Sequence, residues 1–175
     1  MNGCKWGTFK NKKDGNVKKE ELKSLMEDSL EYAKKLLLRD GKLLPVAFII
    51  YGDNIDIIGL SFRDNEEKDQ ELVILRKLVR KKNAYAVYVI VESWYVTSNK
   101  IDLTIEPSKH PMRKECLFII GECGEGDVTI LKMFDRKNGE IIFGEKTDIG
   151  KINSLKFDFG IKDMNKQNKD LRDLS

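Results

Sequence analysis

The sequence of 175 residues has no long hydrophobic run, few cysteines and one histidine. Its longest apolar runs, residues 43–50 and 84–91, are far shorter than the ~20 residues that a membrane-spanning helix needs. The polar, lysine-rich N-terminus lacks the apolar centre of a signal peptide. Three cysteines, Cys4, Cys116 and Cys123, form no even disulfide framework and are typical of a reducing compartment. We therefore expect a soluble cytoplasmic protein that contacts no membrane.

An excess of charge of one sign is also missing. The chain has 32 Lys and Arg against 29 Asp and Glu, and a net charge of +3 is too small to predict a polyanionic partner by itself. The length is typical of one domain. We expect a single domain over residues 16–161, preceded by a loose leader at 1–15 and followed by a polar tail at 162–175.

Hydrophobic periodicity predicts helices at residues 17–39 and 66–82. Asn16 and Asp64 are predicted N-caps, Glu67 completes a capping box with Asp64, and Gly41 is predicted to end the first helix. Strands are predicted at residues 45–51, 55–62, 84–97, 115–121, 128–134 and 140–143, with a further edge strand at 155–161. Asn138-Gly139 predicts a type I′ hairpin turn.

The predicted order α-β-β-α-β-β-β-β indicates an α+β domain. We expect a mostly antiparallel sheet of about five to six strands with both helices on one face. The strand at 84–97 is apolar on both faces, which is typical of a central strand. There is no repeated βαβ unit and no glycine-rich turn from a strand into a helix, which disfavours Rossmann and P-loop folds.

The first candidate site is the end of the central strand. Glu92 interrupts an apolar strand on the face that carries Trp94, so a helical cover would desolvate its carboxylate and favour acid–base chemistry or a buried partner. The alternative places Glu92 beyond that cover, with its charge in water and Trp94 at the edge of the core.

The loop after this strand holds the only histidine, His110, between Pro107 and Pro111. Two prolines stiffen the backbone, and a loop of fixed shape suits binding or catalysis. Glu106 and Lys109 lie nearby, and the candidate ligand-binding residues of this region are Trp94, Ser108, Arg113 and Lys114. A plain surface loop with solvated charges is the alternative interpretation.

Metal and cofactor sites receive little support. Cys116 and Cys123 have a spacing that no ordinary structural zinc site uses, so no metal and no cofactor is predicted. Carboxylates such as Asp53, Asp56 and Asp127 could bind Mg²⁺ only if the fold brought them together.

A cluster of cations occupies the end of the second predicted helix. Its members are Arg76, Lys77, Arg80, Lys81 and Lys82. Clustered cations are typical of binding to a phosphate backbone, and they are also what the C-terminal end of a helix dipole favours. No aromatic side chain interleaves with them to stack on bases.

Residues 84–120 resemble a group of small uncharacterised prokaryotic α+β proteins. The shared pattern is a hydrophobic strand ending in Glu92-Ser93-Trp94, then Pro107-Ser108-Lys109-His110-Pro111 and Arg113-Lys114-Glu115, then a second hydrophobic strand. No activity is assigned to that group, so the resemblance implies a fold relationship and a notable loop.

Three functions stay open at this point. The first is a binding or protein-interaction module that associates with itself or with another protein, because no recognised catalytic constellation is present and an antiparallel sheet must cover its edges. The second is a small hydrolase that uses Glu92 or Glu106 with His110, and in which Arg113 or Lys114 binds an anionic group. The third and weakest is nucleic-acid binding through the basic helix end.

Overall fold

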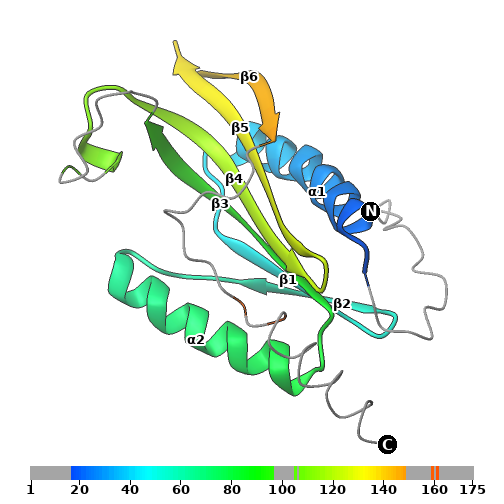
Figure 1. The fold of residues 1–175 in the computed structure, drawn as a ribbon. Helices are drawn as coiled ribbons and strands as arrows, with labels where there is room; N and C mark the ends of the chain where they lie inside the picture. The colour runs from blue at the N-terminus through cyan, green and yellow to red at the C-terminus, as the bar shows by residue number, and fades with distance from the viewer. Residues whose placement is uncertain (1–16, 97–104, 106, 149–158, 160, 162–175) are drawn as a thin grey trace, which may run out of the picture.

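The computed structural model describes residues 17–96, 105, 107–148, 159 and 161 (Figure 1). The predicted leader, the predicted tail and Asn16 lie outside the described residues. The elements are α1 (Lys19–Asp40), β1 (Val46–Tyr51), β2 (Asn54–Gly59), α2 (Asn65–Lys81), β3 (Ala86–Val96), the 3₁₀ turn η1 (Pro107–Lys109), β4 (Arg113–Cys123), β5 (Gly126–Lys137) and β6 (Glu140–Asp148). This order confirms the α+β class. Neither described helix is long and apolar enough to cross a membrane.

The six strands form one antiparallel sheet in the order β2-β1-β3-β4-β5-β6. The predicted central strand is confirmed, because β3 pairs with β1 on one side and with β4 on the other. Asn138 and Gly139 have φ values of 54° and 83°, as a type I′ turn requires, and they join β5 to β6. The outer strands of the described sheet are β2 and β6.

α1 begins at Lys19 with Lys18 as its N-cap, so the prediction that Asn16 caps this helix is wrong. The end of α1 and the start of α2 follow the expected chemistry. Gly41 ends α1 in the left-handed conformation with φ 71°, and its N–H donates to the Leu37 carbonyl. Asp64 caps α2 by accepting the N–H of Glu67 at 2.9 Å. The Glu67 carboxylate accepts the N–H of Arg63 rather than that of Asp64, so the predicted capping box forms in modified form.

The two helices lie on opposite faces of the sheet, so the prediction that both cover one face is wrong. α1 packs on Tyr88 and Ile90, whereas α2 packs on Val87 and Val89. Successive residues of a strand point to opposite faces, and β3 is apolar on both. Each apolar face needs its own cover, which is why one helix is required on each side.

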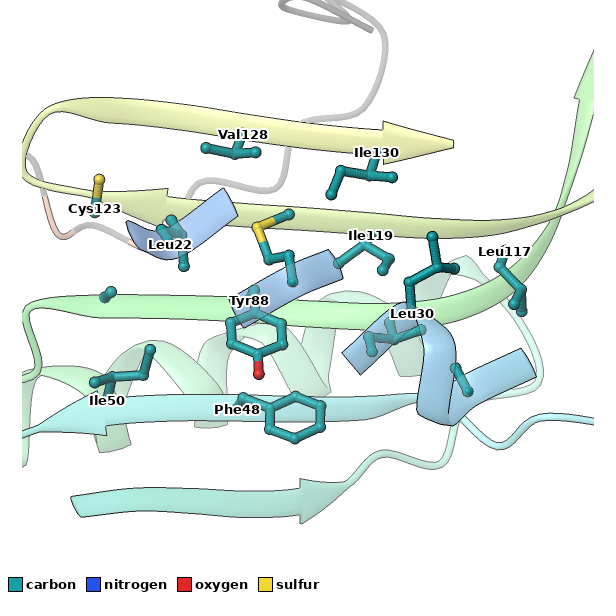
Figure 2. Packing of buried hydrophobic residues seen from close by; sticks show 14 of the residues in the cluster. Leu22, Leu30, Phe48, Ile50, Tyr88, Leu117, Ile119, Cys123, Val128 and Ile130 are labelled. Carbon is teal, nitrogen blue, oxygen red and sulfur yellow. The ribbon is translucent and has the colours of Figure 1, made fainter. Parts of the chain in front are cut away.

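The α1 face holds the larger aromatic side chains (Figure 2). Phe48 of β1 stacks on Tyr88 of β3, with ring centroids 4.5 Å apart. The buried Tyr88 hydroxyl is 2.8 Å from the hydroxyl of Ser29 on α1, so the hydrogen bond satisfies both groups. Burial raises the pKa of Tyr88, and the hydroxyl stays protonated.

The α2 face receives a contribution from the C-terminal part of the chain. Phe159 and Ile161 are buried there, and the Phe159 N–H donates to the buried Glu122 carboxylate at 2.8 Å. Most of the predicted edge strand at 155–161 lies outside the described residues, and neither Phe159 nor Ile161 is in a strand. These two apolar residues complete the core rather than extend the sheet.

Gly121 of β4 allows α1 to pack closely on the sheet. A Cβ atom there would lie 2.8 Å from the Met26 sulfur and 3.1 Å from the Tyr88 Cβ. We expect Gly121→Ala to lower the free energy of unfolding by about 1–3 kcal/mol, because the extra methyl group overpacks the core. Urea denaturation followed by circular dichroism measures the change.

Gly59→Ala is the matched control, because nothing lies within 4 Å of a Cβ atom at that position. Its expected effect is within about 0.5 kcal/mol, as for most exposed substitutions. Equal effects of the two alanine substitutions would contradict the close packing at Gly121.

Candidate functional site

Glu92 lies where α1 ends, and its carboxylate has two partners. One oxygen accepts the backbone N–H of Leu43 at 3.0 Å, and the other accepts the Arg136 guanidinium at 2.6 Å. The side chain is partly buried. The sequence analysis expected either acid–base chemistry or a buried partner for Glu92. The structure shows such a partner, Arg136, which links Glu92 to neighbouring segments of the chain.

Arg136 of β5 joins three segments of the chain. Its guanidinium donates to Glu92 on β3, to Glu115 on β4 at 2.9 Å, and to the carbonyl of Gly41 at 2.6 Å. The Glu115 carboxylate raises the pKa of Arg136, burial opposes this shift, and Glu92 adds to it. The arrangement fastens the end of α1 to three adjacent strands.

Sequence reasoning missed Arg136 because it lies 44 residues from Glu92. The only signal that could have found it is the register of the sheet. Glu115 is opposite Trp94 on β3 and opposite Phe134 on β5, so Glu92, Glu115 and Arg136 occupy one face of neighbouring strands.

Trp94 and Arg113 are two predicted ligand-binding residues that the fold brings together. The Arg113 guanidinium lies over the Trp94 ring, 4.8 Å from its centroid, and Trp94 remains 38% exposed. Such a contact is a cation–π interaction. It forms an exposed aromatic and cationic patch beside the Arg136 cluster, on the same face of the sheet.

His110 is buried directly after η1. Its Nδ1 accepts the backbone N–H of Met112 at 3.1 Å, and its carbonyl accepts the N–H of Arg113. The Nδ1 lone pair of His110 is therefore engaged by the backbone of its own loop.

Glu92 and His110 occupy different parts of the molecule. Glu92 is four residues before Val96, the last residue of β3, which places it about 13 Å along the strand from that end. η1 lies beyond the ends of β3 and β4 (Figure 1). No contact joins Glu92 to His110 within the part of the chain that the structure describes.

The other predicted residues of this loop do not converge either. Ser108 lies in η1 and is exposed. Lys114 is opposite Tyr95 and points to the other face of the sheet from Arg113. Glu106 lies outside the described residues.

An open depression of about 450 Å³ lies beside the Arg136 cluster. Its walls are Leu38, Gly41, Arg136, Gly139, Glu140 and Ile141. Neither Glu92 nor His110 lines it, and the Arg136 guanidinium is already shared between two carboxylates and a carbonyl. The depression therefore brings no pair of acid and base groups together.

The basic end of α2 is divided in two by the fold. The ammonium group of Lys82 forms an ion pair with Asp56 at 2.7 Å. It also donates a hydrogen bond to the Tyr51 hydroxyl and lies over the Tyr51 ring, so Lys82 is bound within its own chain. Lys77, Arg80 and Lys81 are exposed, whereas Arg76 is partly buried. The exposed cationic surface is thus smaller than the sequence cluster indicates.

Metal ligands do not gather in the described residues. No group of three or more His, Cys, Asp or Glu side chains there is arranged to hold a metal ion. Cys116 and Cys123 are buried free thiols on opposite faces of β4.

The model of one protein family, described as bacteriophage lambda protein ea47, matches residues 2–161. The chain belongs to the family of bacteriophage lambda protein ea47. No curated protein and no solved structure matches the chain. This match extends over most of the chain, whereas the expected resemblance covered mainly residues 84–120. The description of the family names a phage protein.

Arg136→Met tests the Arg136 cluster of this ea47-family chain. The substitution keeps the aliphatic stem but leaves two carboxylates and a helix-end carbonyl without their shared donor. We expect the free energy of unfolding to fall by about 1–3 kcal/mol, measured by urea denaturation. Lys137→Met is the matched control, because Lys137 makes a 3.6 Å surface ion pair with Asp135, and we expect it to cost about 0.5 kcal/mol or less. Equal losses would show that the cluster adds nothing.

The two described cysteines are expected to be unreactive in the folded protein. Burial raises the pKa of the Cys116 thiol to about 12, and burial also raises the pKa of Cys123. Because the thiolate is the reactive form, a Cys4→Ser variant should show no rapid reaction with Ellman's reagent at pH 8. In denaturant, both thiols of the same variant should become accessible and react with the reagent. Rapid reaction in native buffer would contradict the burial of these side chains.

Proposed function

We propose that this chain is a non-enzymatic protein-interaction module that associates with itself. The observation that carries the proposal is an open antiparallel sheet. Both helices cover faces of the sheet, and no described strand pairs with the outer edge of β2 or of β6. Unpaired N–H and C=O groups at an edge are a template for another strand.

Exposed apolar side chains at both edges support the same proposal. Ile57 on β2 is 58% exposed and Ile142 on β6 is 51% exposed. An apolar side chain beside unpaired backbone groups gains from burial when a second strand is added. The edges therefore offer both hydrogen bonds and apolar contact to a partner.

The hydrolase hypothesis stays a prediction with less support. Glu92 is committed to Arg136 and to the Leu43 N–H, and the Nδ1 of His110 is committed to Met112. General acid–base catalysis needs such groups within hydrogen-bond reach of one reacting atom. Glu92 lies within β3 and His110 lies in the loop beyond the end of that strand, which weighs against their acting on one substrate atom.

Nucleic-acid binding also stays a prediction. Lys77, Arg80 and Lys81 remain available at the surface, but Lys82 is paired with Asp56. Three exposed cations on one helix end are what its dipole favours in any case. No specific observation raises this hypothesis above the interaction module.

We further propose that the module works in the cytoplasm of a prokaryotic cell. The free thiols of Cys116 and Cys123 support this placement, because reduced cysteines are typical of a reducing compartment.

Light scattering coupled to size-exclusion chromatography tests self-association. The protomer mass is 20.2 kDa, and we expect the measured mass to rise towards twice that value as the concentration increases from micromolar to millimolar. The rise is gradual because an interface made of strand edges is small. A protein that stays at the protomer mass over this whole range would overturn the proposal.

A further inference from the structure

We propose that β2 is the edge through which two copies pair, antiparallel and about a twofold axis at Ile57. The inference rests on the self-association proposed above and names its surface and register. The partner is a second copy of this chain, whose β2 continues the sheet.

The backbone of β2 presents a symmetric set of hydrogen-bonding groups. Leu60 donates its N–H to the Pro45 carbonyl at 2.8 Å, which marks this position as a hydrogen-bonded pair. Such pairs alternate along an antiparallel ladder, so Asn54, Asp56 and Ile58 face β1. Ile55, Ile57 and Gly59 therefore point their N–H and C=O groups outward, with Ile57 at the centre.

A twofold axis perpendicular to the sheet at Ile57 uses all three outward positions. Ile57 pairs with Ile57 of the second copy, and Ile55 pairs with Gly59 on either side. Each hydrogen-bonded pair exchanges two bonds, so the seam holds about six. The same axis keeps the α1 faces of both copies on one side, where the exposed Ile57 side chains meet.

Charge selects this register over its neighbour. Asp56 is the only charged residue of β2, and it is bound by Lys82 and Tyr51 of its own chain. An axis at Asp56 would place two carboxylates directly opposite each other, which is unfavourable. An axis at Ile57 places Asp56 opposite Ile58 and avoids that repulsion.

β6 lacks these properties. It contains four charged residues, namely Glu140, Glu145, Lys146 and Asp148. A β-bulge interrupts it, because Gly144 and Glu145 are both opposite Met133. Charges and bulges are the devices by which edge strands avoid pairing, and β2 has one charge and no bulge.

β2 is the outer strand of the sheet on the side away from β6. α1 packs over β3, β4 and β5, and α2 packs on the opposite face. β2 forms the border of the sheet below β1 in Figure 2. Among the described residues, no strand pairs with the outer edge of β2.

Disulfide trapping at Ile57 tests the register. In a hydrogen-bonded antiparallel pair the Cα atoms are about 5.5 Å apart, within the range that a disulfide spans. We expect Ile57→Cys in a Cys4→Ser background to form a covalent dimer under mild oxidation with diamide. Ile142→Cys is the matched control, because that residue is similarly exposed on the other edge. We expect it to stay monomeric on a non-reducing gel.

Ile57→Pro provides a second measurement that spares the fold. The outward N–H of Ile57 has no partner within its own sheet, so proline removes only bonds of the seam. Circular dichroism should be unchanged, and dimerisation should weaken by roughly tenfold or more in light scattering.

The outcomes separate the two proposals. Trapping at Ile57 together with weakened association of the proline variant supports the β2 seam. A dimer that is trapped equally at Ile142, or that the proline variant leaves intact, overturns the seam and leaves self-association standing. A wild-type protein that is always monomeric overturns both.

Discussion

The whole architecture depends on β3 being apolar on both faces. A strand of this kind must be buried on two sides, and it lies at the centre of the sheet between β1 and β4. Each face then requires a cover, and the described helices α1 and α2 supply one each. The hydrogen bond between Ser29 and Tyr88 and the close approach at Gly121 position α1 on its side.

Because each described helix covers one face, the unpaired backbone groups at the sheet edges must be protected by residues of the edge strands themselves. β6 does so with charges, a bulge and contacts to α1, since Lys146 pairs with Glu27 and Lys34 lies over Phe143. In the described part of the chain, β2 has one charged residue, Asp56, and its pairing with β1 contains no bulge. The difference between the two edges follows from their residues, and it is the physical basis of the interaction proposed for this member of the ea47 family.

Local patterns predicted the elements well, because each depends on nearby residues. The glycine that ends α1, the Asp64 cap and the Asn138-Gly139 turn are examples. The placement of the helices was wrong even though the two-sided apolar pattern of β3 contained the answer. The site was harder, because the partner of Glu92 is Arg136, and only the register of three strands brings them together. The burial of Phe159 against Glu122 has no local signal either.

The contact between Phe159 and Glu122 bears on when the protein can fold. Phe159 and Ile161 fill the core on the α2 face, 37 residues or more after the carboxylate that holds the Phe159 backbone. Helix α2 and its strands come earlier in the chain and can collapse before these residues are synthesised, but the core on that face is complete only once Phe159 and Ile161 have packed. A product cut before Phe159 would leave apolar surface exposed on the α2 face and would lose one hydrogen bond to the Glu122 carboxylate. Such a product would be a substrate for cellular quality control.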